Sequence, residues 1–344
     1  MSILDEILDF LHYHPESSRR MVEEGICAKA SPATVKRTIA SAIDSGLIIK
    51  YGIGKASVYS ITPKAHLLRT VDLDSYYALD FDKRQVQTGY NFKLIRETMP
   101  AIDIFTADEK ERLAKCQSAF SEHMADLSPT GYNKEMERLG IDLSWKSSEI
   151  EGNTYTLLET VNLLKDKIEA KGKKREEAIM LLNHKEALKA IVERPYYFKT
   201  LSLAQIEDVH SILIEELGVE RNLRHRRVGI SGTLYRPLEV ESQIREAIDD
   251  MCALVNGKEN PYEKALLALL LIAYIQPFMD GNKRTSRLVS NALLIAHGYC
   301  PLSFRSVEAG DYRAALLLFY EQNNLSAFKR IFIDQAEFAV NEYF

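Results

Sequence analysis

One stretch constrains this chain more than any other: Gln276-Pro-Phe-Met-Asp-Gly-Asn-Lys-Arg-Thr-Ser-Arg287. An apolar run over residues 262–275 precedes it, and the apolar residues that follow, over 288–295, recur at helical spacing. Pro277 and Gly281 are residues that end helices, so a second helix is expected to start directly after the glycine. The stretch is therefore predicted to be a loop between two buried helices.

The residue types in this loop suit an anion. Gly281 and Asn282 place backbone N–H groups at a helix N-terminus, where the dipole favours negative charge. Three cations follow, Lys283, Arg284 and Arg287. Arg284 and Arg287 are three residues apart and therefore share one helix face. Asp280 adds one carboxylate, which suits a Mg²⁺ ion that bridges phosphate oxygens. A nucleoside triphosphate with its metal fits this set, whereas the plainer alternative is a solvated, capped helix start.

The same stretch resembles the signature of Fic-domain proteins, His-x-Phe-x-Asp/Glu-Gly-Asn-Gly-Arg-x-x-Arg. The positions that agree with it are Pro277, Phe278, Asp280, Gly281, Asn282, Arg284 and Arg287. Gln276 stands where the family has its catalytic histidine, and Lys283 stands where many members have glycine. The resemblance covers roughly residues 100–344. It implies an all-α Fic core with a β-hairpin flap, so the expected fold class is mainly α.

The resemblance also implies an activity, the transfer of AMP from ATP to a Ser, Thr or Tyr hydroxyl of a protein, with this chain itself as one candidate target. Such a reaction depends on positioning and charge neutralisation. The roles implied are Mg²⁺ binding by Asp280 and nucleotide binding by Gly281, Asn282, Lys283, Arg284 and Arg287. Family members are often dimers, so a homodimer is compatible with the resemblance.

Gln276 raises the main question about activity. An amide neither accepts a proton nor titrates in the working range, and a missing general base costs about 10²–10⁴-fold in rate. Three accounts fit: a naturally degenerate site, a nucleotide-sensing DNA-binding regulator with an inactive Fic site, or a His→Gln change made to trap a complex. Lys283 resembles the Doc branch, which transfers phosphate. Gly281 and Arg287 favour AMP transfer, and a Doc-like phosphotransferase is the alternative.

A second motif lies at the end of a helix expected over residues 133–151. Ser147, Glu151 and Gly152 fit the inhibitory motif of one Fic class, Ser/Thr-x-x-x-Glu-Gly/Asn. In that class the glutamate pairs with the last arginine of the signature, which here is Arg287. An arginine fork accepts a carboxylate or a phosphate with the same geometry, so Glu151 would occupy the place of a terminal phosphate. The alternative is a plain C-terminal turn capped by glycine.

Residues 228–237 precede the signature and are predicted to form a β-hairpin around Ser231-Gly232. This hairpin resembles the Fic flap, whose exposed strand edge registers a target segment by main-chain pairing. The resemblance implies target docking by Gly232, Thr233, Leu234 and Tyr235. An ordinary surface hairpin is the alternative. The arginine-rich run over residues 221–227 is expected to be a structural or solvated cluster.

The N-terminal region resembles a winged helix-turn-helix. Helices are expected over residues 3–13, from a cap at Ser17 or Ser18 through Val22, and over 33–45, followed by strands over 47–51 and 57–62. Between residues 29 and 64 one acid, Asp44, faces six bases: Lys29, Lys36, Arg37, Lys50, Lys55 and Lys64. Such a local basic face in a chain of net charge −5 is typical of duplex-DNA binding. The residues expected to contact DNA are Thr34, Lys36, Arg37, Lys50 and Lys55, and the alternative is a protein-binding module.

The predicted organisation is a winged helix-turn-helix over residues 1–68, a connector over 69–100 and a Fic domain over 101–344. The four cysteines are scattered without metal-ligand spacing and are expected to be reduced thiols. The N-terminus has early acids and no basic leader segment, and the longest apolar run is too short to cross a bilayer. A cytoplasmic protein without membrane contact is therefore expected.

Overall fold

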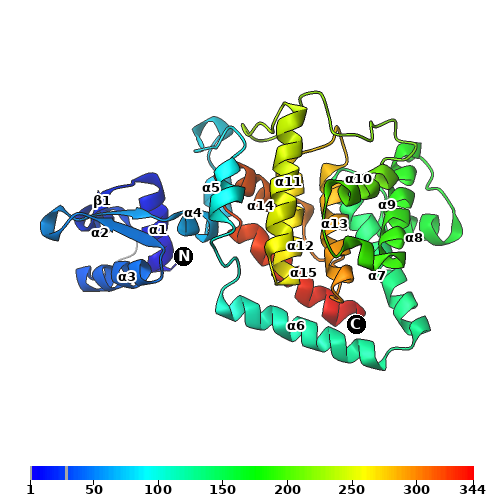
Figure 1. The fold of residues 1–344 in the computed structure, drawn as a ribbon, viewed down its shortest axis with the longest axis horizontal. Coiled ribbons are helices and arrows are strands. Elements are labelled where there is room, and N and C mark those ends of the chain that lie inside the picture. The colour runs from blue at the N-terminus through cyan, green and yellow to red at the C-terminus, as the bar shows by residue number, and fades with distance from the viewer. Residues whose placement is uncertain (1, 28–29) are drawn as a thin grey trace. The chain divides into compact units, whose positions relative to one another are not determined.

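The computed structural model describes residues 2–27 and 30–344, together with all of their side chains except that of Lys55. Lys29, one of the six bases of the N-terminal region, lies outside the described residues. Helices dominate the chain, which forms two compact units (Figure 1). The first unit combines residues 1–88, 231–235 and 314–328, and the second combines 89–230, 236–313 and 329–344. The predicted domain boundaries near residues 68 and 100 stay a prediction.

The first unit begins with three helices and a small antiparallel sheet. Its elements are α1 (Ile3–Tyr13), β1 (Ser17–Ser18), α2 (Arg19–Gly25), α3 (Pro32–Asp44), β2 (Ile48–Tyr51), η1 (Gly54–Ala56) and β3 (Val58–Ile61). The strand order is β1-β3-β2, with Ser17 opposite Tyr59 and Ile48 opposite Ile61. Ser31 caps α3 by accepting from the Thr34 N–H. Apolar side chains of the helices and the sheet form one core: Ile7, Leu8, Leu11, Val22, Val35, Ile39, Ala42, Ile48, Ile61 and Ala65.

The rest of the first unit is held by buried polar contacts. Its short elements are α4 (Pro63–Leu68), α5 (Leu73–Tyr77) and η2 (Phe81–Lys83). The hydroxyl of Tyr76 donates to the buried carboxylate of Glu321 at 2.7 Å, and Arg84 forms an ion pair with the same group at 3.1 Å. Tyr77 donates to the Ala314 carbonyl at 2.7 Å. These contacts fix the aromatic segment to the 314–328 helical segments of the same unit.

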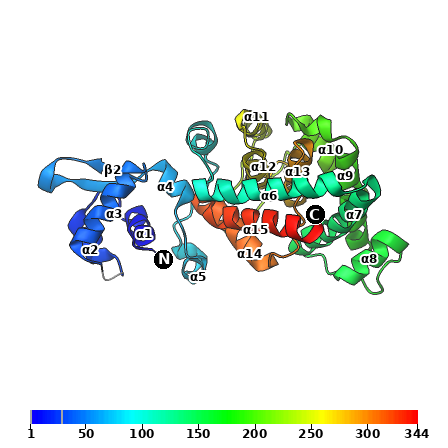
Figure 2. The ribbon, with the colours of Figure 1, turned by 90° about the horizontal axis from the view of Figure 1, so that it is seen from below.

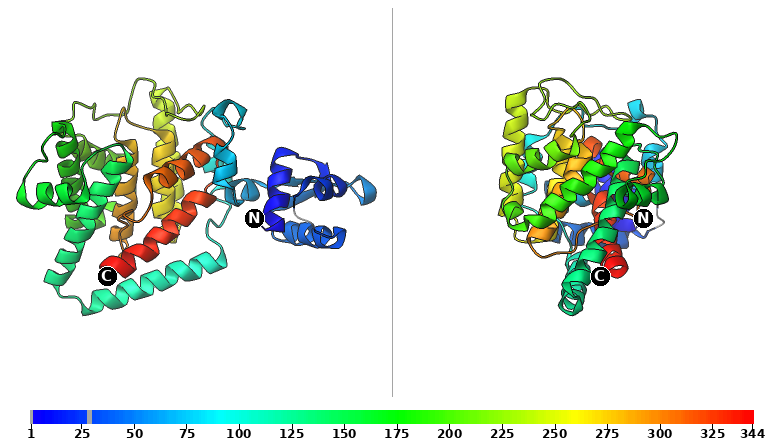
Figure 3. Two further views of the ribbon diagram at one scale, coloured as in Figure 1. Left: turned by 180° about the vertical axis from the view of Figure 1, so that it is seen from behind. Right: turned by 90° about the vertical axis from the view of Figure 1, so that its right-hand side faces the viewer.

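The second unit holds most of the helices. Its elements are η3 (Leu94–Thr98), α6 (Ala107–Asp126), α7 (Pro129–Ile150), α8 (Leu157–Asp166), α9 (Arg175–Glu193), η4 (Pro195–Phe198), α10 (Leu203–Leu213), α11 (Glu241–Gly257), α12 (Pro261–Ile275) and α13 (Asn282–Ala296). Helices α12 and α13 lie side by side at its centre, and α12 is buried on all sides (Figures 1 and 3). The packing of these two helices places the loop between them at a fixed position.

The last two helices contribute residues to both units. They are α14 (Ala309–Gln322) and α15 (Ser326–Tyr343). Within the second unit α6 runs alongside α15 (Figure 2), where Arg112 pairs with Glu337 at 2.7 Å and Lys329 pairs with Glu109 at 2.7 Å. Among the residues that the structure describes, no helix combines the length and the apolar character needed to cross a bilayer.

The β-hairpin predicted over residues 228–237 is wrong. The chain turns at Ser231-Gly232, but the described backbone on either side forms no strand, apart from an isolated bridge between Arg236 and Gly89. The alternating pattern misled because at least one backbone group here bonds to a side chain. The Thr233 Oγ1 accepts from the Tyr235 N–H at 3.1 Å, in place of a bond across a strand pair. Target docking by residues 232–235 stays a prediction.

Candidate functional site

The conformation of the loop between α12 and α13 is held by the side chain of Asn282. Gln276 ends α12 with φ 52° and ψ 60°, and Gly281 precedes α13 with φ 79°, a left-handed conformation that glycine adopts at low cost. Asn282 closes the turn, because its Oδ1 accepts from the Phe278 N–H and its Nδ2 donates to the Phe278 carbonyl, both at 2.8 Å. The Asn282 side chain therefore shapes the loop, and the free backbone N–H groups at the start of α13 remain the anion-binding element.

Gln276 is itself part of this loop structure. Its Nε2 donates to the Ala273 carbonyl at 2.6 Å, and its Oε1 accepts from the Asn282 Nδ2 at 3.1 Å. Only 8% of the residue is exposed. The amide bridges the end of one helix and the start of the next, and it offers no group that can take up a proton.

Two arginines from α13 are buried beside the loop. Arg284 is 2% exposed, and within the described residues its side chain forms an ion pair with Asp280 at 3.3 Å. Burial lowers the pKa of Arg284, although Asp280 and Glu151 oppose the effect. Its Nη1 is buried without a hydrogen-bond partner in the part of the chain that the structure describes. An unpaired buried guanidinium nitrogen is costly, and a bound anion would satisfy it.

The end of α7 lies against the second arginine. Arg287 is fully buried and donates through Nε to the Ser147 hydroxyl and through Nη2 to the Ser147 carbonyl, both at 2.8 Å. The same Nη2 donates to the Glu151 carboxylate at 3.0 Å. Gly152 follows with φ 96° and turns the chain away. The structure thus brings together Ser147, Glu151 and Arg287.

Lys283 adds a contact that the sequence did not suggest. Its Nζ lies 3.2 Å from the second carboxylate oxygen of Glu151, so one carboxylate bridges two cations. Burial would raise the pKa of Glu151, but Arg287 and Lys283 outweigh it and hold that pKa below its usual value. Glu151 is therefore an anion at neutral pH and occupies the end of the cation cluster.

A layer of buried rings supports the cluster, and sequence reasoning missed it. His184 on α9 is fully buried 3.4 Å from the Ser144 hydroxyl, and burial, with Arg287 and Arg284 nearby, lowers its pKa to about 3. His210 on α10 stacks on Phe278, with ring centroids 3.6 Å apart. The Nε2 of His210 donates to the Asp280 carbonyl at 3.0 Å. No local pattern marks these residues, because their partners are distant in sequence.

The metal and DNA candidates lie as follows. The side chain of Asp280 is 67% exposed, and its Oδ1 accepts from the Gly281 N–H at 2.6 Å. In the first unit Lys36, Arg37 and Lys50 are exposed. Thr34 is half-buried, and its hydroxyl shares a 2.9 Å hydrogen bond with Ser31. The Lys55 side chain lies outside the structural description, and residues 232–235 belong to the first unit.

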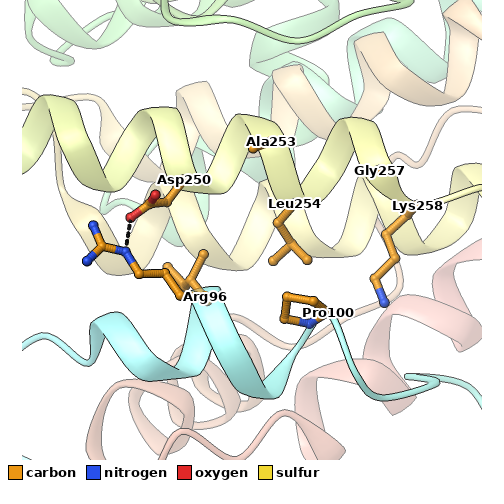
Figure 4. Close-up of a pocket in the computed structure, with 8 residues that line it drawn as sticks. Arg96, Pro100, Asp250, Ala253, Leu254, Gly257 and Lys258 are labelled. Carbon is orange, nitrogen blue, oxygen red and sulfur yellow. Dashed lines mark hydrogen bonds and ion pairs between the residues drawn. The ribbon is translucent and has the colours of Figure 1, made fainter.

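A separate hollow lies along α11, lined by Arg96, Pro100, Asp250, Leu254 and Lys258 among others (Figure 4). Arg96 donates to Asp250 at 2.7 Å and to Glu246 at 2.6 Å, and Lys258 donates to the Met99 carbonyl at 3.0 Å. Both cations therefore have protein partners. The loop between α12 and α13 remains the better candidate for an anion.

Comparison with known proteins gives the family of this region. Residues 200–294 match the model of the Fic/DOC family. A protein adenylyltransferase Fic from Nematostella vectensis is 33% identical over 174 residues, which cover 49% of this chain and 40% of that protein. One from Drosophila willistoni is 27% identical over 276 residues, covering 78% of this chain and 54% of that protein. The chain spans about half the length of these curated relatives.

Solved structures agree on the fold. Fic-1 from C. elegans superposes with a TM-score of 0.59 at 20% identity, over 69% of this chain and 71% of that one. A Fic domain containing signaling protein from Bacteroides thetaiotaomicron gives 0.55 at 18% identity, over 67% and 96%. The family match over residues 200–294 and the sequence relatives show that this chain contains a Fic domain, and the solved structures share its fold.

Proposed function

We propose that this chain is a Fic-type protein adenylyltransferase, which transfers AMP from ATP to a Ser, Thr or Tyr hydroxyl of a protein target or of the chain itself. The observation that carries the proposal is the cation cluster at the start of α13. There, Arg284 is buried with an unpartnered Nη1 among the described residues, and Arg287 is occupied by a carboxylate. The relatives named protein adenylyltransferase support the same reaction.

The nucleotide phosphates would lie across the N-terminus of α13. The backbone N–H groups of Asn282 and Lys283, which have no carbonyl partner within the helix, would bind one phosphate, while Arg284 binds the β-phosphate and Arg287 the γ-phosphate. The target hydroxyl oxygen would attack the α-phosphorus, the bond to the β-phosphate would break, and pyrophosphate would leave. The cations stabilise the charge that develops on the leaving group.

Asp280 fits a Mg²⁺ site. Its carboxylate is mostly exposed at the mouth of the loop, and one hard oxygen donor is a usual protein contribution when phosphates and water supply the rest. Bound Mg²⁺ would neutralise phosphate charge. The Gly281 N–H and Arg284 keep the carboxylate turned toward the start of α13.

Glu151 would act as an inhibitor of the same site. It takes the guanidinium that the γ-phosphate needs, and its charge repels the nucleotide. Removal of the carboxylate should therefore open the site. The motif at Ser147, Glu151 and Gly152 and the geometry at Arg287 support this proposal.

Gln276 would leave the reaction without its general base. The hydroxyl proton needs an acceptor, and the amide of Gln276 is already committed to Ala273 and Asn282. We therefore expect the chain with Gln276 to bind ATP, and to transfer AMP about 10²–10⁴-fold more slowly than a chain with histidine at this position.

The test uses the chain as it stands, Gln276→His, and Gln276→His with Glu151→Gln. Each protein is incubated with Mg²⁺ and ATP labelled on the α- or the γ-phosphate. Protein labelling from the α-phosphate that needs Gln276→His and rises with Glu151→Gln is the expected result. Labelling from the γ-phosphate would favour the Doc-like phosphotransferase instead. ATP binding without any labelling would favour a nucleotide-sensing regulator.

A DNA partner belongs to the same proposal. The order of three helices and a three-stranded antiparallel sheet supports a winged helix-turn-helix at residues 1–68. Lys36, Arg37 and Lys50 are exposed there and free to meet phosphates. Yet Ile53, at 91% exposed, lies at the tip of the wing and favours the alternative of a protein-binding module. Titration of labelled duplex DNA at two salt concentrations separates the two.

A further inference from the structure

Arg224 is a fully buried side chain between α10 and α11, and its donors converge on the backbone around the signature loop. Its Nε donates to the Gln276 carbonyl at 2.6 Å, and its backbone N–H donates to the Pro277 carbonyl at 3.0 Å. Its Nη1 donates to the Arg226 carbonyl at 3.0 Å, and its Nη2 donates to the Leu238 carbonyl. One residue therefore holds two consecutive carbonyls of the loop together with the carbonyls of Arg226 and Leu238.

These contacts act where the backbone is least favourable. Gln276 adopts a left-handed conformation, which is unfavourable for a residue with a Cβ, and its carbonyl lies beyond the last turn of α12. A guanidinium donor satisfies that carbonyl with a charge-assisted bond. Because the carbonyls of residues 276 and 277 are both held, the two peptide planes are fixed, and so is the direction of the side chain at position 276.

We propose that Arg224 is a positioning residue for the side chain at position 276, and that it couples this position to the backbone at Arg226 and Leu238. The proposal rests on the proposed adenylyl transfer, in which position 276 carries the general base after Gln276→His. A base must lie within hydrogen-bond reach of the hydroxyl proton, and a misplacement of about 1 Å can lower a rate about 10²-fold. Arg224 itself touches no reacting atom.

The planar fork matters as well as the charge. Arginine directs separate N–H groups at three carbonyls, whereas lysine concentrates its donors on one nitrogen. Arg224→Lys thus keeps a buried cation but loses the parallel contacts, and Arg224→Met loses both. Arg226→Met is a matched control, because that side chain is exposed and its ion pair with Glu220 spans 3.9 Å.

The first experiment measures single-turnover AMP transfer in the full chain with Gln276→His and Glu151→Gln as the parent. We expect a rate about 10-fold lower with Arg224→Lys and about 10²-fold lower with Arg224→Met, while the ATP Kd changes less than about 3-fold. Arg226→Met should match the parent. Equal rates in parent and Arg224→Lys, or a loss of ATP affinity as large as the loss of rate, would overturn the proposal.

The second experiment needs no activity. Amide hydrogen exchange is followed across residues 276–281 in the unsubstituted chain and in the same three variants. Exchange there should be about 10-fold faster with Arg224→Lys and unchanged with Arg226→Met. Unchanged exchange in Arg224→Lys refutes the positioning role. Absence of AMP transfer in the parent counts against the proposed function alone, since the exchange result still decides whether Arg224 fixes the loop.

Discussion

Replacement of Glu151 by glutamine should tighten ATP binding. The substitution keeps the shape of the side chain and removes the charge that sits 3.0 Å from Arg287 and 3.2 Å from Lys283. A terminal phosphate on the same guanidinium would lie about 4 Å from that carboxylate, where like unit charges repel by about 4 kcal/mol at an effective dielectric constant of about 20. Glu151 can swing away in part, so the repulsion is an upper bound.

A gain of about 1.4–2.8 kcal/mol remains reasonable, which corresponds to a Kd for ATP that is about 10–100-fold lower. The assay is isothermal titration calorimetry with ATP and Mg²⁺, repeated with ADP. Because ADP lacks the γ-phosphate, its Kd should fall much less. Glu149→Gln is the control, since Glu149 pairs with Lys146 at 2.7 Å, whereas Arg287 pairs with Glu151.

Two results would contradict this reasoning. An ATP Kd that changes less than about 3-fold in Glu151→Gln would mean that the carboxylate does not compete with phosphate. An equal gain for ATP and ADP would mean that the carboxylate acts on the whole site through folding rather than at Arg287. Thermal unfolding of each variant then shows whether an equal gain for ATP and ADP accompanies a loss of stability of the fold.

Three further predictions follow from other contacts. Lys283→Met should weaken ATP binding about 3–10-fold in a chain that also carries Glu151→Gln, and much less in a chain that keeps Glu151, because the Glu151 carboxylate then holds the Lys283 ammonium. Calorimetry on the double-mutant cycle measures the coupling between the two residues. The pKa of His184 is about 3 in the folded chain and 6.5 in the unfolded chain, so below pH 6.5 the unfolded chain binds one more proton. The free energy of unfolding therefore decreases by up to about 1.4 kcal/mol for each pH unit that the pH is lowered. Urea unfolding at pH 7 and pH 5 should show a smaller decrease in His184→Asn than in the unsubstituted chain. If the first unit binds duplex DNA, Lys36→Ala with Arg37→Ala should lower the slope of log affinity against log salt by about 2, and an unchanged slope in fluorescence anisotropy argues for a protein partner.

The contiguous part of the site could be predicted from sequence because its physics is local. Pro277, Gly281 and the apolar residues on both sides define a loop between buried helices, and the structure has α12 and α13 there. The pairing of Glu151 with Arg287 needed the family resemblance in addition, since no periodicity links residues so far apart. The structure brings the two together at 3.0 Å.

The remaining contacts could not be predicted because they depend on tertiary packing. Arg224 looked like one of several arginines in a cluster, and only the fold shows that it alone is fully buried while Arg226 and Arg227 face solvent beside Glu220 and Glu239. The hairpin prediction failed for a related reason. Alternation in sequence does not distinguish a paired strand from an extended segment whose backbone groups bond to side chains.

The amide at position 276 has a consequence for how slowly such a chain unfolds. Its two hydrogen bonds join the last turn of α12 to the first residue of α13. An imidazole at that position is shorter, and its ring nitrogens do not lie where the amide has its donor and its acceptor. The form without a base would then be the more durable one, with slower unfolding and longer resistance to proteolysis. Durability and turnover would be traded against each other at a single residue.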